Sequence, residues 1–152
     1  MQLAEITNPA PARVIVSTRQ IQKPLVQVYK AWTTPSLLKK WWGPKGFTNT
    51  FNEFHLEPGG YWRFIMHGPD GKNYDNESQF VTIAPLRKIV FNHITPPVFQ
   101  VVASFEKAGD NATLLTFTMI FDTESTRQKL QQIVVPSNEE NFDRLEAVLE
   151  TM

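Results

Sequence analysis

The side chains best suited to acid–base chemistry near neutral pH are three histidines, His55, His67 and His93. A histidine that faces a cavity can donate to a ligand carbonyl or act as a general acid or base. The strand pattern described below turns His55 and His67 outward and brings His93 close to Ser78. His93 is therefore the one weak catalytic candidate. The alternative is a histidine whose ring only hydrogen-bonds a backbone group or water.

Other kinds of site lack their sequence signatures. No His-x-His or Glu-x-x-His spacing offers the converging ligands that zinc needs, so we expect no metal and no cofactor. No Gly-x-Ser-x-Gly nucleophile motif is present. Gly59-Gly60 and Asp70-Gly71 are turn signals that precede no helix, so they do not form a phosphate loop. Whether the chain is an enzyme stays open, and we expect that it is not.

The composition limits the partners and the compartment. The 152 residues include 15 basic and 15 acidic side chains and no cysteine. A zero net charge gives no electrostatic footprint for nucleic acid or an anionic membrane, so we expect neither partner. No signal peptide or membrane-length apolar run is visible, which predicts a cytoplasmic protein. We expect a monomer or a weak homodimer.

The turn and capping signals predict the elements that must position any site. Residues 1–12 are expected to be a loose N-terminal arm, and residues 13–152 a single domain. A strand over 13–20 is followed by a helix that begins at Pro24 and a short helix from Pro35 to Trp42. Turn residues then separate six further strands, near 47–56, 60–67, 74–84, 87–94, 99–107 and 112–121.

The C-terminal part is predicted to be helical in two pieces. A helix over 123–134 is expected to break at Pro136, and Ser137-x-x-Glu140 is typical of a capping box that starts a last helix. Phe142, Leu145 and Leu149 of this last helix fall on one face. Since an antiparallel sheet needs its apolar face covered, the pattern favours an α+β fold with the terminal helix on the sheet.

Strand alternation predicts which side chains face inward. In the second and third strands the apolar positions Phe54, Trp62 and Phe64 alternate with charged or polar ones, so the apolar set should be inside. The tight turn after Ala84 should bring Phe80 near Phe91. The alternative is that these residues are ordinary core. The candidate cavity-lining residues are Trp41, Trp62, Phe64, Ser78, Phe80, Phe91, His93, Phe99, Phe117, Phe142 and Leu145.

Several short motifs occur in an order that resembles a known family. They are Ala31-Trp32-Thr33-Thr34-Pro35, Trp41-Trp42-Gly43-Pro44, Pro58-Gly59-Gly60, Gly68-Pro69-Asp70-Gly71 and a Pro85 turn before an apolar strand, with Asp143-Arg144-Leu145 in the terminal helix. The chain resembles the domain related to the activator of the ninety-kilodalton heat-shock chaperone ATPase, within the START-like, birch-pollen-allergen-like (SRPBCC) superfamily. The terminal helix of that family often begins with Gly-Trp, where this chain has Asn141-Phe142.

The resemblance implies a fold and a set of functions. The implied helix-grip fold curls a seven-stranded antiparallel sheet around the C-terminal helix, with two short helices between strands 1 and 2 and an apolar cavity inside. The first implied function is non-enzymatic binding of a small hydrophobic or aromatic ligand in that cavity. The alternatives are a chaperone ATPase co-activator with a role in the stress response, and a polyketide cyclase-like enzyme that uses His93.

Overall fold

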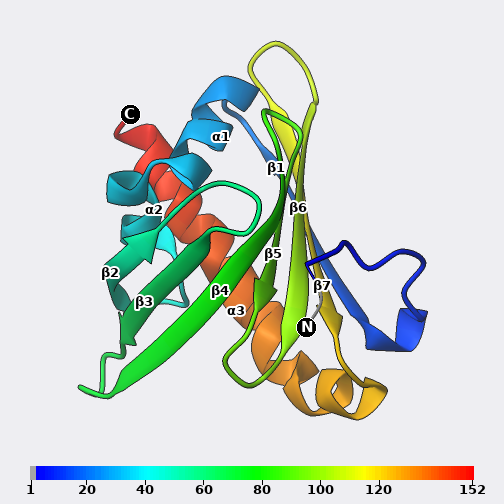
Figure 1. Cartoon of the computed structure of the whole chain (residues 1–152). Helices are drawn as coiled ribbons and strands as arrows, with labels where there is room; N and C mark the ends of the chain where they lie inside the picture. Colours follow the sequence, from blue (N-terminus) through cyan, green and yellow to red (C-terminus); the bar gives the residue numbers. More distant parts are fainter. Residues whose placement is uncertain (1–2) are drawn as a thin grey trace.

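The computed structural model describes residues 3–152 and shows a sheet curved around a long helix (Figure 1). A single 3-10 turn at Pro11–Arg13 leads into the first strand. In chain order the elements are β1 (Val14–Ile21), α1 (Leu25–Thr33), α2 (Pro35–Trp41), β2 (Thr48–Phe54), β3 (Tyr61–His67), β4 (Asn73–Ala84), β5 (Lys88–His93), β6 (Phe99–Lys107), β7 (Thr113–Phe121) and α3 (Glu124–Glu150).

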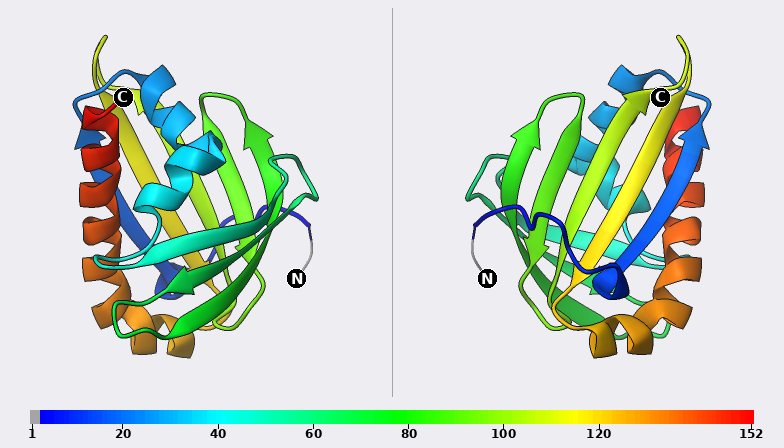
Figure 2. Two further views of the ribbon diagram at one scale, coloured as in Figure 1. Left: turned by 90° about the vertical axis from the view of Figure 1, so that its left-hand side faces the viewer. Right: turned by 90° about the vertical axis from the view of Figure 1, so that its right-hand side faces the viewer.

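The strands form one antiparallel sheet in the order β1-β7-β6-β5-β4-β3-β2. The sheet wraps around α3, and α1 and α2 lie on the same concave side (Figure 2). Short turns join the consecutive strands β2 to β7, while the two helices connect β1 at one edge to β2 at the other. The α+β, helix-grip architecture predicted from the sequence is confirmed.

The strand register brings the expected side chains together. Ser78 of β4 lies opposite Trp62 of β3 on one side and opposite His93 of β5 on the other. Phe80 lies opposite Phe91 as predicted, with a bulge between Phe80 and Thr82 that shifts the register set at the turn. Because neighbours across an antiparallel pair share a face, these residues all point to the concave side.

The terminal helix corrects one prediction. α3 is continuous from Glu124 to Glu150, with Pro136 inside it, so the expected break at Pro136 and the capping box at Ser137 are wrong. Proline removes the hydrogen bond to the carbonyl four residues earlier, at Gln132. Both residues are exposed, so water can solvate that carbonyl. The proline therefore bends the helix without ending it. Figure 2 shows the first turns of α3 running at an angle to the rest.

The helix begins one residue after Thr123. The Thr123 hydroxyl accepts a hydrogen bond from the backbone N–H of Thr126 at 3.1 Å, which satisfies one of the free donors at the helix start. The predicted start of helical structure at Thr123 is therefore close to the observed one. What the pattern missed is that the two predicted pieces form one helix.

The N-terminal arm is held against the convex face of the sheet, so the prediction of a loose arm is corrected for the described part. Gln100 accepts from the backbone N–H of Ile6 and donates to the carbonyl of Ala4, each at 2.9 Å. Glu5 pairs with Lys88 at 2.8 Å. The right-hand view of Figure 2 shows the arm crossing the sheet on the side away from α3. Residues 1 and 2 lie outside the described residues.

Tryptophans join α1 and α2 to the sheet. Trp32 packs edge-on against Trp41, with ring centroids 4.9 Å apart, and against Phe105 of β6. The indole N–H of Trp41 donates to the carbonyl of Ala31 at 3.0 Å. The indole nitrogens of Trp32 and Trp62 are buried and have no hydrogen-bond partner within residues 3–152. These aromatic contacts fix the two short helices over one end of the concave face.

Candidate functional site

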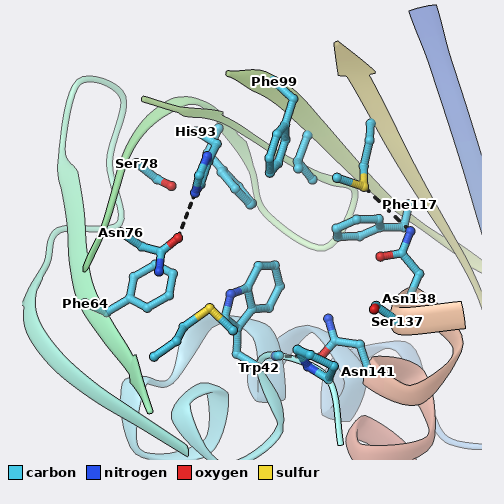
Figure 3. A pocket seen from close by; sticks show the side chains of 16 residues that line it. Trp42, Phe64, Asn76, Ser78, His93, Phe99, Phe117, Ser137, Asn138 and Asn141 are labelled. Carbon is cyan, nitrogen blue, oxygen red and sulfur yellow. Dashed lines mark hydrogen bonds between the residues drawn. The ribbon is translucent and has the colours of Figure 1, made fainter. Parts of the chain in front are cut away.

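A cavity of about 150 Å³ lies between the concave face of the sheet and α3. Its walls come from five adjacent strands, β3 to β7, from the segment that follows α2, and from the middle of α3 (Figure 3). Most of the wall is aromatic or aliphatic, and a few polar side chains interrupt it. A concave, mostly apolar space with few polar groups is the usual form of a small-molecule site.

Six of the eleven candidate lining residues line this cavity: Phe64, Ser78, Phe91, His93, Phe99 and Phe117. The other five do not line it and are buried elsewhere in the core: Trp41, Trp62, Phe80, Phe142 and Leu145. The strand alternation thus selected the correct face of the sheet. It did not distinguish the cavity wall from the packed core, because both are apolar and face the same way.

Trp42 lines the cavity in place of Trp41. α2 ends at Trp41, and Trp42 has extended backbone angles, with φ −67° and ψ 131°. The direction of the Trp42 side chain therefore cannot be predicted from the helical spacing of α2. Its indole packs 5.0 Å from that of Trp62 and 6.0 Å from the ring of Phe91. The tryptophan beyond the helix end faces the cavity, while the tryptophan within the helix is packed behind it.

Polar residues form the wall contributed by α3. The sequence predicted Phe142 and Leu145 there, but Ser137, Asn138 and Asn141 line the cavity instead. Asn138 and Asn141 are buried on the side of α3 that also carries Phe142, at spacings of three and four residues. This spacing could have predicted that the two asparagines face the sheet, because they extend the apolar face of the helix toward its N-terminus. It was missed because Asn138 was assigned to the capping turn of the last helix and only apolar residues were assigned to the buried face.

Ser78 is a polar group without a partner inside the protein. Its side chain is 0% exposed, and its hydroxyl finds no hydrogen-bond partner among the described residues. A buried hydroxyl without a partner costs free energy, so native proteins rarely keep one without a reason. Figure 3 shows Ser78 on the cavity wall beside His93.

Both ring nitrogens of His93 contact polar groups of the protein. Nδ1 lies 2.9 Å from the carbonyl oxygen of Pro97, which can only accept, so Nδ1 carries a proton. Nε2 lies 2.8 Å from the side-chain oxygen of Asn76; a neutral ring accepts at Nε2, so it requires the Asn76 amide to turn its NH2 toward the ring. The ring stacks on Phe99 with centroids 4.5 Å apart. Burial lowers the pKa of His93, because the charged imidazolium is poorly solvated, while hydrogen bonds to the backbone of Pro97 and Thr95 oppose this.

The segment 42–47, which supplies Trp42, Gly43 and Pro44 to the cavity, is fixed to α3. The guanidinium of Arg144 donates to five backbone carbonyls, those of Lys40, Trp42, Gly43, Pro44 and Phe47, at 2.8–3.3 Å. The side chain of Asn141 accepts from the backbone N–H of Gly43 at 3.0 Å. Burial lowers the pKa of Arg144. The position of this segment therefore depends on two side chains of α3, of which Asn141 lines the cavity and Arg144 does not.

Gly43 is required where this segment turns. Its φ is +99°, and a Cβ placed there would lie 2.7 Å from Cε of Met66, another residue of the cavity wall. Glycine adopts this conformation without a steric penalty, whereas other residues are strained in it. The Gly43-Pro44 pair predicted as a helix stop also shapes the cavity.

The other two histidines lie outside the site. His55 is exposed and pairs with Glu53, while His67 contacts Thr50 and Asn73, each at 2.7 Å. Within residues 3–152 no three His, Asp or Glu side chains are grouped so that they could hold a metal ion. No helix in the described part of the chain is long and apolar enough to cross a membrane.

A seven-stranded antiparallel sheet that grips a C-terminal helix around a cavity defines the START-like class of proteins. A sequence model described as "Activator of Hsp90 ATPase homolog 1-like protein" matches residues 22–150. The chain belongs to this family. The resemblance inferred from the short motifs is thereby confirmed. No curated protein matches the chain in sequence.

Solved structures show the same fold at low sequence identity. A protein from Nitrosomonas europaea superposes with a TM-score of 0.86 at 20% identity, over 93% of this chain and 97% of the other. A protein from Arthrobacter aurescens gives 0.86 at 22% identity, over 99% and 94%. The AHSA1 protein from Silicibacter pomeroyi gives 0.74 at 15% identity, over 91% and 98%. These identities support the shared fold and carry no ligand or activity to this chain.

Proposed function

We propose that this protein binds a small, largely apolar ligand in the cavity between the sheet and α3, without chemically changing it. The observation that carries the proposal is the cavity itself, which is mostly apolar and includes the unpartnered Ser78 in its wall. A buried donor facing an apolar cavity is stabilised when a ligand supplies its hydrogen bond. The helix-grip fold shared with the family supports the same reading.

The direct test is a ligand screen read by intrinsic fluorescence and native mass spectrometry. Trp42 lines the cavity, so a bound ligand should change its emission and add one ligand mass per chain. The screen should contain aromatic, terpenoid and acyl compounds of graded size. Saturable binding at one site supports the proposal. Absence of binding by every compound in both assays contradicts it.

The geometry of His93 argues against the enzymatic alternative. Both ring nitrogens already face protein groups, at Pro97 and Asn76, so neither is directed at a ligand. A general acid or base must be within hydrogen-bond reach of the proton that it transfers. A cyclase-like function therefore needs His93 to leave one of these contacts. Turnover of any ligand from the screen that is lost in His93→Gln, with binding retained, would favour the enzyme over the binding protein.

A role as a chaperone co-activator is the second candidate, and the family description is the observation that favours it. The test measures ATP hydrolysis by the ninety-kilodalton chaperone with increasing amounts of this protein. A stoichiometric rise in the rate, together with a complex in a pull-down, would support this role. An unchanged rate and no complex at tens of micromolar would contradict it.

A further inference from the structure

The volume of the cavity suits a ligand with a single ring. An engineered protein cavity of about 150 Å³ is known to hold benzene. The cavity here has the same volume, and rings such as Trp42, Phe64 and Phe117 form much of its wall. Flat aromatic walls favour a flat ligand, because offset-stacked and edge-on contacts between rings add to the burial of apolar area. A long fatty acyl chain exceeds this volume, and a fused-ring carboxamide leaves little of it free.

The charges around the cavity exclude an ionised ligand. None of the lining side chains within residues 3–152 is Lys, Arg, Asp or Glu. Burial lowers the pKa of His93, which disfavours its charged form. A carboxylate or ammonium group placed here would lose its hydration without gaining a charged partner, which is strongly unfavourable. The preferred ligand therefore carries no charge.

The polar groups on α3 form a donor next to an acceptor. The Asn141 oxygen accepts from the N–H of Gly43, which turns its nitrogen to the other side. The Asn138 nitrogen donates to the Ser17 hydroxyl at 3.1 Å and contacts the Met119 sulfur, which leaves its oxygen available. Figure 3 shows the Asn141 nitrogen and the Asn138 oxygen on the cavity side. Residues three apart on a helix are surface neighbours, so this donor and acceptor lie close together.

A neutral carboxamide group complements this pair. Its carbonyl accepts from Asn141, and its N–H donates to Asn138. Across the cavity, the Ser78 hydroxyl on the sheet can pair with a polar substituent at the far end of the ring (Figure 3). We infer that the cavity selects an uncharged, single-ring aromatic ligand with a carboxamide-like group held by Asn138 and Asn141. This inference rests on the proposed function and narrows it.

The test compares matched probes by NMR titration of the full-length protein. Benzamide is the principal probe. Benzoate has the same size with a charge, toluene lacks the polar group, 2-naphthamide adds a ring, and hexadecanoate tests a long acyl chain. We expect benzamide to bind at least tenfold more tightly than benzoate, toluene or 2-naphthamide. If benzoate binds as tightly as benzamide or more tightly, the requirement for an uncharged ligand is wrong. The same result with toluene refutes the need for a carboxamide, and with 2-naphthamide it refutes the limit to one ring. Any of these results overturns the inferred ligand class.

Two variants assign the polar contacts. Asn138→Leu should weaken benzamide about five- to tenfold and leave toluene unchanged, since one net hydrogen bond is lost. A 4-hydroxyl group added to benzamide should improve binding to the wild type but not to Ser78→Ala. Ser104→Ala, on β6 and outside the cavity lining, is the control and should change neither. An equal loss of benzamide and toluene in Asn138→Leu would show a packing role and overturn the assignment.

The outcomes for the two proposals can be distinguished. If hexadecanoate or another apolar compound binds in the cavity while benzamide does not, the ligand class inferred here is wrong and the proposed binding function stands. If no probe binds to the wild-type protein, both fail. If Asn138→Leu does not fold, the 4-hydroxybenzamide comparison in Ser78→Ala still decides the polar assignment on the sheet side.

Discussion

The guanidinium of Arg144 on α3 donates a 2.8 Å hydrogen bond to the carbonyl of Gly43, in the segment that closes one side of the cavity. The same side chain reaches four other carbonyls between residues 40 and 47. Arginine presents five N–H donors in a planar fork, so it can hold several carbonyls at once. The segment that carries Trp42 is therefore held in place by one cation of α3, which lies beside the cavity and does not line it.

Arg144→Lys should loosen this segment although it keeps the charge. A lysine ammonium is a point donor on a flexible stem and cannot reach all five carbonyls together. We expect the free energy of unfolding to fall by about 1–3 kcal/mol, as for lost hydrogen bonds to a charged group. Amide hydrogen exchange of residues 42–47 should become faster. Arg87→Lys, at an exposed position, is the control and should leave the free energy of unfolding unchanged. An equally small loss of stability in both variants would show that Arg144 does not restrain the segment.

Phe142→Ala should be strongly destabilising. The ring is 1% exposed, packs against Phe117 and lies under the guanidinium of Arg19, and it does not line the cavity. Truncation of a fully packed phenylalanine costs about 3–5 kcal/mol in denaturant melts. Val135→Ala, exposed on the same helix, should cost less than about 0.5 kcal/mol. A loss near 1–2 kcal/mol for Phe142→Ala would instead indicate a ring beside open space.

Ser78→Ala should leave stability unchanged or raise it. The serine hydroxyl is buried without a partner, so its removal takes away a desolvation cost and no hydrogen bond within the protein. We expect the free energy of unfolding, measured with urea, to stay within about 0.5 kcal/mol of wild type or to rise. A loss above about 1 kcal/mol would mean that the hydroxyl makes an unrecognised stabilising contact.

His93 should make the protein less stable in mild acid. Because burial lowers its pKa in the folded state, the unfolded chain binds more protons than the native state below about pH 6.5. Stability due to His93 is therefore present above that pH and decreases as the pH falls toward the folded-state pKa. Urea melts at pH 7.5 and pH 5.5 should show a smaller pH-dependent loss in His93→Gln than in wild type.

The control for this pH dependence is Ser104→Ala on β6, which removes no titratable group and should preserve the wild-type difference between the two pH values. The same pH-dependent loss in wild type and His93→Gln would assign the effect to other groups. An opposite sign, with wild type gaining stability in acid through His93, would contradict the lowered pKa.

The sheet side of the site could be predicted from the sequence because strand geometry is local. Alternation selected the inward face, and Ser78 does lie opposite His93, although the turn pairs Ala84 with Lys88 and a bulge between Phe80 and Thr82 produces the predicted register. A two-residue side-chain period leaves few alternatives once one face is apolar. The order of the short motifs indicated the family, and the fold of that family predicted that the sheet curves around the terminal helix.

The helix side could not be predicted in the same way. Proline usually ends a helix, and only the exposure of Pro136 and Gln132 allows α3 to continue through it. Once the helix was divided there, Asn138 fell in the expected capping turn of the last helix, and the buried face of that helix was counted only from Phe142 onward. Likewise, the orientation of Trp42 follows from backbone angles after the end of α2, which the helical period does not describe.

The most direct test of the central claim is an NMR titration that follows the indole N–H signals of the four tryptophans, with Trp42 assigned through Trp42→Phe. A ligand in the cavity contacts the wall formed by Trp42, whereas Trp41 is packed behind it and donates to Ala31. We predict that benzamide or another apolar ligand from the screen shifts the Trp42 signal most and saturates at one equivalent per chain. No saturable shift of Trp42 with any ligand that fits the cavity would contradict the account.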